Sequence, residues 1–191
     1  MLRERPCAAP VVSQVEYHRS ARRSLQKASA ARANGLHLEV RDSDTWALTD
    51  CSLVFVDHGD LDRFCDEQPR LAKFLWRSTL VDASVHREWT MNVGLREGLS
   101  RMAHLFCELM LRMETIGRAR DGSCILQITQ EDLAEATGMS NVHVNRMLQE
   151  LRGRELISFG RGKLTIHDWD GLVELADFRT DYLHLPVAKA A

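Results

Sequence analysis

The sequence has no long hydrophobic run and no strong excess of charge of either sign, since its net charge is −2. No stretch approaches the ~18 consecutive apolar residues that cross a bilayer. The N-terminal segment is basic but has only a broken apolar patch, which argues against a signal peptide. We therefore expect a cytoplasmic protein without a membrane partner. Its 45% hydrophobic and 27% charged residues are typical of a globular protein.

The sequence also lacks the cysteine clusters of disulfide-rich and metal-binding domains. Its five cysteines are widely scattered, with no C-x-x-C pair: Cys7, Cys51, Cys65, Cys107 and Cys124. This pattern argues against a disulfide framework, a zinc ribbon and an iron–sulfur cluster. Buried or free thiols are expected instead.

Signatures of an enzyme are missing as well. There is no glycine-rich phosphate loop and no suggestive nucleophile–base set. Possible metal ligands gather in segments 57–62 and 167–170, but Asp60 and Asp170 are placed to cap helices that begin near Leu61 and Leu172. We predict no catalytic residue, no metal site and no cofactor.

Charge is uneven along the chain, with eight Lys/Arg against three Glu in residues 1–41. Residues 1–35 are rich in Ala, Arg and Ser and show no lasting periodicity, so we expect a poorly ordered basic leader. A basic arm that lies on DNA is the alternative.

Residues 36–68 contain patterns of two or three short strands, followed by a short helix that Asp60 would cap.

A long helix is predicted over residues 69–94. Pro69 suits its first turn and Gly94 marks its end. The apolar residues recur at helical spacing, at Leu71, Phe74, Leu75, Val81, Val85, Trp89 and Val93. A helix of about 36 Å cannot bury this stripe against short strands. We expect a coiled-coil-like homodimer through residues 69–94, and a central helix of a monomer is the alternative.

A second helix follows the long one and ends at Gly117. Its apolar face consists of Leu99, Met102, Phe106, Leu109, Met110 and Met113. This methionine-rich face is typical of core packing. After it, "RARDGSC" is expected to be a linker and "ILQIT" a short strand.

Residues 129–151 have the pattern of two short helices joined by a tight turn. The first helix begins at Thr129 or Gln130, with acidic Glu131 and Asp132 in its first turn. Gly138 permits the left-handed backbone that ends a helix, and Ser140 is a suitable cap for the next one. Inward positions of the second helix are Val144, Met147, Leu148 and Leu151.

The other face of the second helix is mostly polar, as a helix that enters the major groove requires. The small residue, glycine and apolar residue at Ala134, Gly138 and Val144 have helix-turn-helix spacing. An αα-hairpin without DNA binding would look similar. "LISFGRGKLTIHD" then predicts a β-hairpin, or wing, with Arg161 and Lys163 near its tip to meet phosphates. Helix-turn-helix and wing together favour DNA binding.

From about Thr49 to Leu185 the chain resembles the Crp/Fnr family of bacterial transcription regulators. The most specific portion, "ITQEDLAEATGMSNVHVNRMLQELRGRELISF", is similar to the family's winged helix-turn-helix. "LTDCSLVFVDHGDLDRFCDEQPRLAKFLW" resembles the end of a cyclic-nucleotide-binding-like β-roll, and the helix from Pro69 to Val93 resembles the dimerisation helix. The resemblance implies binding to double-stranded DNA at pseudo-palindromic promoter sites as a homodimer, and action on RNA polymerase.

The predicted DNA-binding residues are Ser140, Asn141, Val142, His143, Asn145, Arg146, Arg161 and Lys163. By resemblance, Ser140 matches a phosphate-contacting position at the helix start, and Asn141, Val142, Asn145 and Arg146 match base- or phosphate-facing positions. Val142 stands where well-studied members have a Glu that accepts a hydrogen bond from a base. Since valine could only touch a thymine methyl, the half-site is expected to differ from theirs.

The front of the chain departs from the family pattern. A whole sensor β-roll needs a longer segment than the 68 residues that precede Pro69. The family's Gly-Glu…Arg phosphate cassette has no counterpart in residues 1–68, and the clustered N-terminal cysteines of oxygen-responsive members are missing. We therefore predict that cyclic nucleotide does not bind.

The expected fold is mostly α with short β elements, an α+β class. Its parts are a leader at 1–35, a remnant of the sensor β-roll at 36–68, a dimerisation helix at 69–94, a winged helix-turn-helix domain at 95–185 and a tail at 186–191. The predicted function is sequence-specific regulation of transcription. The alternative is a truncated remnant that dimerises but has lost effector sensing and regulation.

Overall fold

The computed structural model describes residues 12–17 and 51–185, with side chains from Val56 onward. It divides into two units, Met1–Asp82 and Ala83–Ala191. The expectations for most of the leader, for residues 36–50 and for the tail at 186–191 lie outside the described residues.

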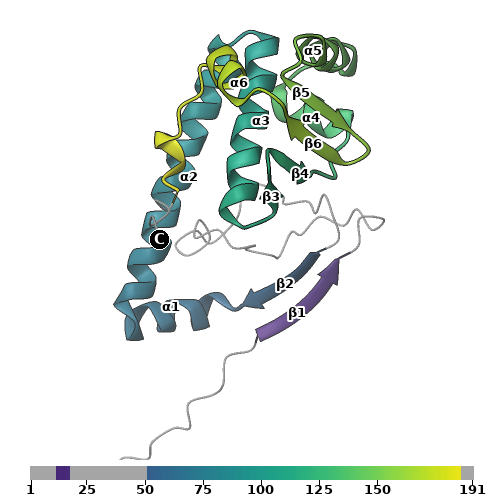
Figure 1. The fold of residues 1–191 in the computed structure, drawn as a ribbon. Helices are drawn as coiled ribbons and strands as arrows, with labels where there is room; N and C mark the ends of the chain where they lie inside the picture. Colours follow the sequence, from purple (N-terminus) through teal and green to yellow (C-terminus); the bar gives the residue numbers. More distant parts are fainter. Residues whose placement is uncertain (1–11, 18–50, 186–191) are drawn as a thin grey trace, which may run out of the picture. The chain divides into compact units, whose positions relative to one another are not determined.

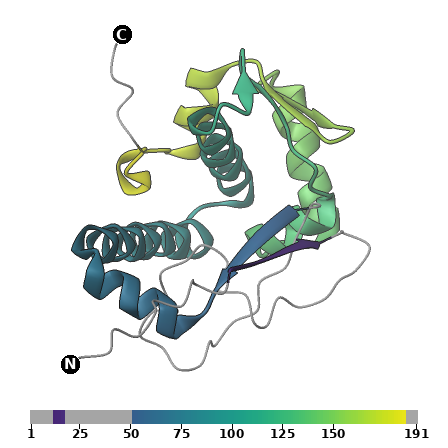
Figure 2. The same ribbon diagram turned by 90° about the horizontal axis from the view of Figure 1, so that it is seen from below.

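The first unit contains a two-stranded antiparallel sheet (Figure 2). Strands β1 (Val12–Tyr17) and β2 (Cys51–Val56) pair with Val12 opposite Val56 and Tyr17 opposite Cys51. β2 lies within a predicted strand pattern. β1 lies within the predicted leader, where no strand pattern was found in the sequence.

Helix α1 (His58–Glu67) begins earlier than the sequence predicted, because its N-cap is Asp57 and not Asp60. Asp57 has the extended backbone of an N-cap, and its side chain accepts a hydrogen bond from Gly59 N at 2.8 Å. Asp60 instead lies in the first turn, where its carboxylate is 2.8 Å from Arg63 Nη2. The choice among closely spaced aspartates depends on backbone conformation, which residue type alone does not fix.

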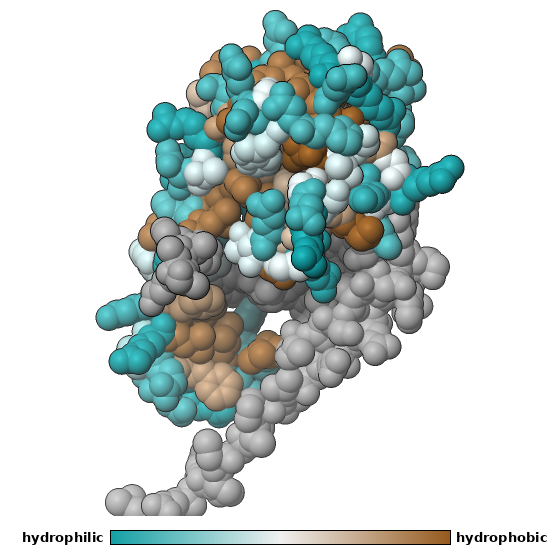
Figure 3. Space-filling model, viewed as in Figure 1, coloured by the Kyte–Doolittle hydropathy of each residue, from teal (hydrophilic) through white to brown (hydrophobic). Residues whose placement is uncertain are grey.

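Helix α2 (Pro69–Leu95) begins at the predicted proline and extends one residue beyond Gly94. Val85 and Trp89 are partly buried against the core of their own chain, so this part of the predicted stripe packs within the protomer. Other apolar side chains of α2 are exposed, among them Trp76 at 68% and Leu80 at 55%. In Figure 3, hydrophobic residues gather where α1 meets the first turns of α2.

The second unit is built around helix α3 (Gly98–Thr115), which packs against α4 (Gln130–Thr137), α5 (Asn141–Gly153) and α6 (Trp169–Ala176) (Figure 1). Met102, Phe106 and Met110 are buried as predicted. A short 3-10 turn, η2 (Asp181–Leu183), follows α6. The prediction of a mostly α fold with short β elements is confirmed.

Asp168 caps α6, with its side chain accepting a hydrogen bond from Gly171 N at 2.9 Å, so the prediction that Asp170 is the cap is wrong. Asp170 lies in the first turn of the helix. A carboxylate there is favoured by the helix dipole, which explains why both positions suit an acidic residue.

The four-stranded sheet of the second unit has the order β3-β4-β6-β5. The strands are β3 (Ala119–Arg120), β4 (Ser123–Ile125), β5 (Ile157–Gly160) and β6 (Lys163–Ile166). The predicted linker "RARDGSC" thus forms a hairpin, and "ILQIT" is not a strand beyond Ile125. β4 gains its partner β6 from much later in the chain, which local periodicity could not reveal.

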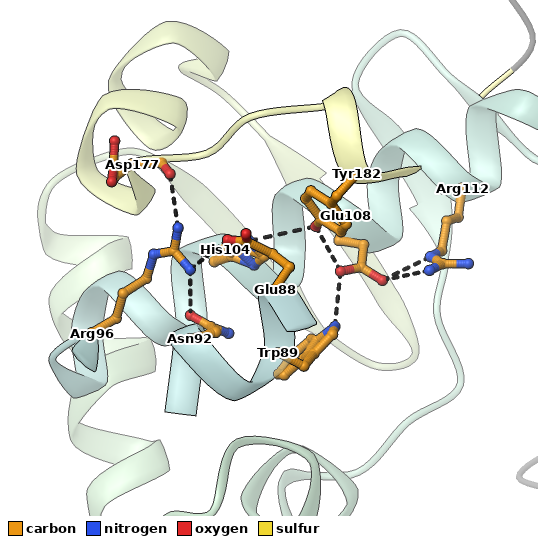
Figure 4. A network of polar contacts seen from close by, with 9 residues as sticks. All are labelled: Glu88, Trp89, Asn92, Arg96, His104, Glu108, Arg112, Asp177 and Tyr182. Carbon is orange, nitrogen blue, oxygen red and sulfur yellow. Dashed lines mark hydrogen bonds and ion pairs between the residues drawn. The ribbon is translucent and has the colours of Figure 1, made fainter. Parts of the chain in front are cut away.

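Glu108 of α3 is a buried carboxylate that ties two other elements to this helix (Figure 4). Its Oε2 accepts hydrogen bonds from Trp89 Nε1 of α2 at 2.9 Å and from the Tyr182 hydroxyl of η2 at 2.8 Å. Its Oε1 accepts from Arg112 Nε at 2.8 Å. Burial and the neighbouring carboxylate raise the pKa of Tyr182, so the hydroxyl stays protonated and donates.

His104 is fully buried beside this network, between the rings of Trp89 and Tyr182 (Figure 4) and in contact with the ring of Phe178. Burial lowers its pKa to about 4, and the charge of Arg96 acts in the same direction. The ring is therefore neutral at pH 7, and the 3.3 Å contact between its Nε2 and Glu88 Oε1 is not an ion pair. Arg96 Nη1 forms the ion pair with Glu88 at 2.8 Å, and its Nη2 donates to Asp177 O at 3.0 Å.

Candidate nucleic-acid interface

A capping box fixes the start of α4. Asp132 N donates to Thr129 Oγ1 at 3.1 Å, and Thr129 N donates to Asp132 Oδ2 at 2.6 Å. The acidic residues predicted for the first turn, Glu131 and Asp132, are there. Near the end of α4, Thr137 is buried and Ala136 is exposed.

The turn between α4 and α5 has the predicted chemistry. Gly138 has φ 64° and ψ 33°, in the left-handed region, and Met139 N donates to Ala134 O at 3.0 Å. Ser140 then caps α5, its hydroxyl accepting from His143 N at 3.3 Å. The predicted stop at Gly138 and restart at Ser140 are confirmed.

Arg101 of α3 forms hydrogen bonds with the last residue of α4 and with the C-terminal end of α2. Its Nη1 donates to Thr137 O at 2.8 Å. Its Nη2 donates to Val93 O at 2.8 Å and to Arg96 O at 2.9 Å, both near the C-terminal end of α2. One guanidinium therefore joins the helix-turn-helix to the last turn of α2.

The two faces of α5 separate as predicted. The inward residues Val144, Met147, Leu148 and Leu151 are all buried. The opposite face is exposed and consists of Asn141, Val142, Asn145, Arg146 and Gln149. Val142 is 82% exposed, which is unusual for a valine and leaves its methyl groups free to touch a base. The helix ends at Gly153.

His143 stands apart from the other predicted contacts because its ring is only partly exposed. It lies against Gly98, where an added Cβ would be 2.7 Å from His143 Nε2. The same nitrogen is 3.4 Å from Arg146 Nη2. His143 thus packs between the start of α3 and Arg146, a position from which it orients the arginine.

The predicted wing is present as the β5–β6 hairpin, which lies beside α5 (Figure 1). Its two-residue tip, Arg161 and Gly162, has φ of 51° and 72°, the pattern of a tight hairpin turn. Lys163 opens β6 opposite Gly160, and both Arg161 and Lys163 are exposed. The structure therefore brings two cations to the end of the hairpin.

Arg152, at the C-terminal end of α5, was missed by the sequence-based set. Its Nη2 donates to Phe159 O of the wing. The signal that could have found it is its spacing, since it continues the outward line of Val142, Asn145 and Gln149 at intervals of three and four.

Among residues 56–185, no three His, Cys, Asp or Glu side chains are grouped as a metal site. Asp57 and Asp168 cap helices, and Asp60 and Asp170 lie in the first turns of the same helices. In the same part of the chain, no helix is long and apolar enough to span a membrane.

Residues 100–175 match the family model of the Crp-like helix-turn-helix domain. No curated protein matches the sequence.

Several solved structures share the fold at low sequence identity. FixK2 from Bradyrhizobium japonicum is 16% identical with a TM-score of 0.66, over 86% of this chain and 97% of that one. A CRP/FNR family transcriptional regulator from Thermus thermophilus is 18% identical with a TM-score of 0.60, over 87% and 100%. A CooA variant from Carboxydothermus hydrogenoformans is 12% identical with a TM-score of 0.65, over 86% and 88%.

Proposed function

We propose that this chain, a member of the Crp/Fnr family of DNA-binding transcription regulators, binds a pseudo-palindromic promoter site as a homodimer. Members of this family regulate transcription and are not enzymes. The observation that carries the proposal is the polar, exposed face of α5, which stands beside the basic end of the wing. By family resemblance, RNA polymerase is the protein partner and the cytoplasm the place of action.

The predicted DNA-binding residues at the start of α5 differ in the part of the DNA that each would contact. Ser140 and Asn141, at the start of α5, would meet a phosphate because backbone N–H groups at a helix start favour an anion. Asn145 and Arg146 are the base-reading residues, since amide and guanidinium groups make paired hydrogen bonds to adenine and guanine edges. Val142 would touch a thymine methyl, and His143 would hold Arg146 in place.

Substitution separates base reading from backbone contact. Arg146→Ala should cost ~1–3 kcal/mol on the best site and relax preference at one base position. Lys163→Ala should weaken all sequences alike and flatten the dependence of affinity on salt. Binding of Arg146→Ala as tight as wild type on that site would refute its role, and a Lys163→Ala effect confined to one base position would refute a phosphate contact.

The dimer would use a face of α2 other than the stripe first predicted. Exposed residues Trp76, Leu80, Ala83, Arg87 and Met91 follow one another at intervals of four, three, four and four, the spacing of a two-helix seam. The exposure of Trp76, Leu80 and Met91 in a single chain is costly, because large apolar side chains favour burial. A symmetric second copy would cover this line with the same line of its own helix.

Sedimentation equilibrium tests the dimer with a matched pair of variants. Leu80→Glu, on the exposed line, should give monomers, since it would place two carboxylates at the seam. Phe74→Glu is the control: Phe74 is 65% exposed, but lies about a third of a turn away from Leu80. A wild-type chain that sediments as a monomer would refute the dimer, and dissociation by Phe74→Glu alone would refute this face.

Selection of bound duplexes from a random DNA pool tests the whole proposal. The expected outcome is two half-sites in inverted order, about one helical turn apart from centre to centre. A chain that dimerises but enriches no sequence would favour the alternative, a remnant that has lost regulation.

A further inference from the structure

Residues 177–185, which follow α6, form a strap that contacts both α2 and α3 (Figure 4). At the start of the strap, Asp177 O accepts a hydrogen bond at 3.0 Å from Nη2 of Arg96, the residue that follows α2. Further along, the Tyr182 hydroxyl donates to Glu108 Oε2 of α3 at 2.8 Å. The strap therefore spans the junction between the two helices.

Apolar packing fixes the strap in this position. Phe178 and Leu183 are buried, with 7% and 4% of each residue exposed. The rings of Phe178 and Tyr182 both contact the buried ring of His104 in α3, with centroids 5.1 and 5.8 Å away. Because burial of apolar surface is favourable, the strap is held against α3 as part of the folded domain.

Glu108 and Arg96 each join the strap to α2. Glu108 Oε2, which accepts from Tyr182, also accepts from Trp89 Nε1 of α2 at 2.9 Å. Arg96 Nη1 pairs with Glu88 Oε1 of α2 at 2.8 Å, while its Nη2 donates to the strap. The side chains of Arg96 and Glu88 are only 15% and 24% exposed, so water screens this pair less than a surface pair. Both links would be lost if α2 turned away from α3.

The backbone between α2 and α3 is short. Residues 96 and 97 alone separate Leu95, the last residue of α2, from Gly98, the first residue of α3. A few residues at the ends of helices can absorb a hinge motion through changes of φ and ψ. The angle between the helices therefore depends on side chains that cross the junction, and the strap provides contacts of this kind to each helix.

This angle affects the proposed DNA contact because α5 starts beside the junction. His143, near the start of α5, lies against Gly98 of α3. The 13 residues of α5 span about 20 Å. A rotation of about 10° at the junction would move the far end of α5 by ~3.5 Å, roughly one base-pair step of DNA. In a dimer joined through α2, the half-site spacing that fits both copies of α5 would change with it.

We propose that the strap is a positioning element, which fixes the angle between α2 and α3 and thereby the half-site spacing that the dimer accepts. This inference rests on the proposed function and adds to it the residues that set the spacing. The strap lies beyond the helix-turn-helix domain at 100–175. Tyr182 and Arg96 therefore act through the helices and not by touching DNA.

Tyr182→Phe tests the strap, because it removes the bond to Glu108 and keeps the aromatic ring. Arg179→Gln is the matched control, since Arg179 also lies on the strap but pairs with Asp181 at the surface, where the two side chains are 80% and 76% exposed. Affinity is measured on duplexes that carry the selected half-sites at the selected spacing, and on duplexes with base pairs inserted or removed between the half-sites. A duplex with a single half-site is measured beside them.

Wild type should bind the selected spacing most tightly. Loss of a hydrogen bond to a carboxylate changes an equilibrium about tenfold, so Tyr182→Phe should reduce the preference for this spacing by up to about tenfold. Its affinity for the single half-site should equal that of wild type, because the helix-turn-helix is unchanged. Arg96→Met, which removes the bond between the strap and the end of α2, should act in the same way. Arg179→Gln should match wild type on every duplex.

A spacing preference in Tyr182→Phe as large as that of wild type would overturn the inference. Equal losses on all duplexes, the single half-site included, together with a lower melting temperature, would show that the strap only stabilises the domain. If Tyr182→Phe does not fold, the same comparison on Arg96→Met decides.

Failure of the proposed function would look different. A wild-type protein that binds no duplex would refute that function. A wild-type protein that binds paired half-sites better than a single one, but equally at every spacing, would refute the role of the strap alone.

Discussion

Arg101→Met should destabilise the second unit strongly, although the side chain is partly exposed. The guanidinium donates three hydrogen bonds, at 2.8, 2.8 and 2.9 Å, to the carbonyls of Thr137, Val93 and Arg96. Hydrogen bonds to a charged group contribute roughly 1.5–3 kcal/mol each. Water can replace the bond to Val93 O, which is exposed, but less easily the one to Thr137, which is fully buried.

The expected loss is therefore about 2–4 kcal/mol, a large share of the ~5–15 kcal/mol by which a domain is stable. Chemical denaturation followed by circular dichroism would measure it. Arg154→Met serves as the control because it breaks only a surface pair with Glu150, for which ~0–1 kcal/mol is expected. The reasoning fails if Arg101→Met is no less stable than Arg154→Met.

Hydrogen exchange would show where the loss is felt. Since Arg101 joins the end of α2 to the end of α4, amides near Gly138 should exchange faster in Arg101→Met than in wild type. A uniform increase over the whole second unit would instead indicate global destabilisation without a special role in the turn.

Three further outcomes are expected. The pKa of His104 falls from 6.5 to about 4 on folding, so the unfolded chain binds more protons between these two pH values. The free energy of unfolding should therefore drop by up to ~3 kcal/mol as the pH falls from 6.5 to 4. His104→Asn should make this drop smaller in denaturation curves, and a drop as large as that of wild type would contradict the prediction. Gly98→Ala should weaken DNA binding several-fold in a mobility-shift assay, because the new methyl would lie 2.7 Å from His143 Nε2, and unchanged affinity would argue against that packing. Burial raises the pKa of Cys107 to about 12 and also raises that of Cys124, so mass spectrometry should find both alkylated at pH 8 only after unfolding, and Cys107 labelled in the folded protein would disprove its burial.

Residue types at neighbouring positions were enough to predict the helix-turn-helix of α4 and α5. The left-handed glycine, the serine cap and the inward spacing of Val144, Met147, Leu148 and Leu151 concern neighbours on one helix or turn. Such features depend on residues at most a few positions apart. The wing was predicted for the same reason, because a tight hairpin joins strands that are adjacent in sequence.

Apart from the choice among neighbouring aspartates at the starts of α1 and α6, the errors occurred where residues far apart in the sequence meet. β4 was placed too late because its partner β6 comes after two helices. Arg152 was missed because its importance depends on the wing folding back beside α5. His143 was grouped with the free reading residues because Gly98, which it packs against, belongs to another helix.

The sequence by itself determined that α2 is long, amphipathic and begins at Pro69, and that α5 carries one polar face after a capped turn. Only the tertiary structure decided which side of α2 the chain covers with its own core, at Val85 and Trp89, and which side it leaves exposed, at Trp76 and Leu80. The physical reason is that helical periodicity shows which residues share a face, whereas burial of that face depends on which distant elements pack against it.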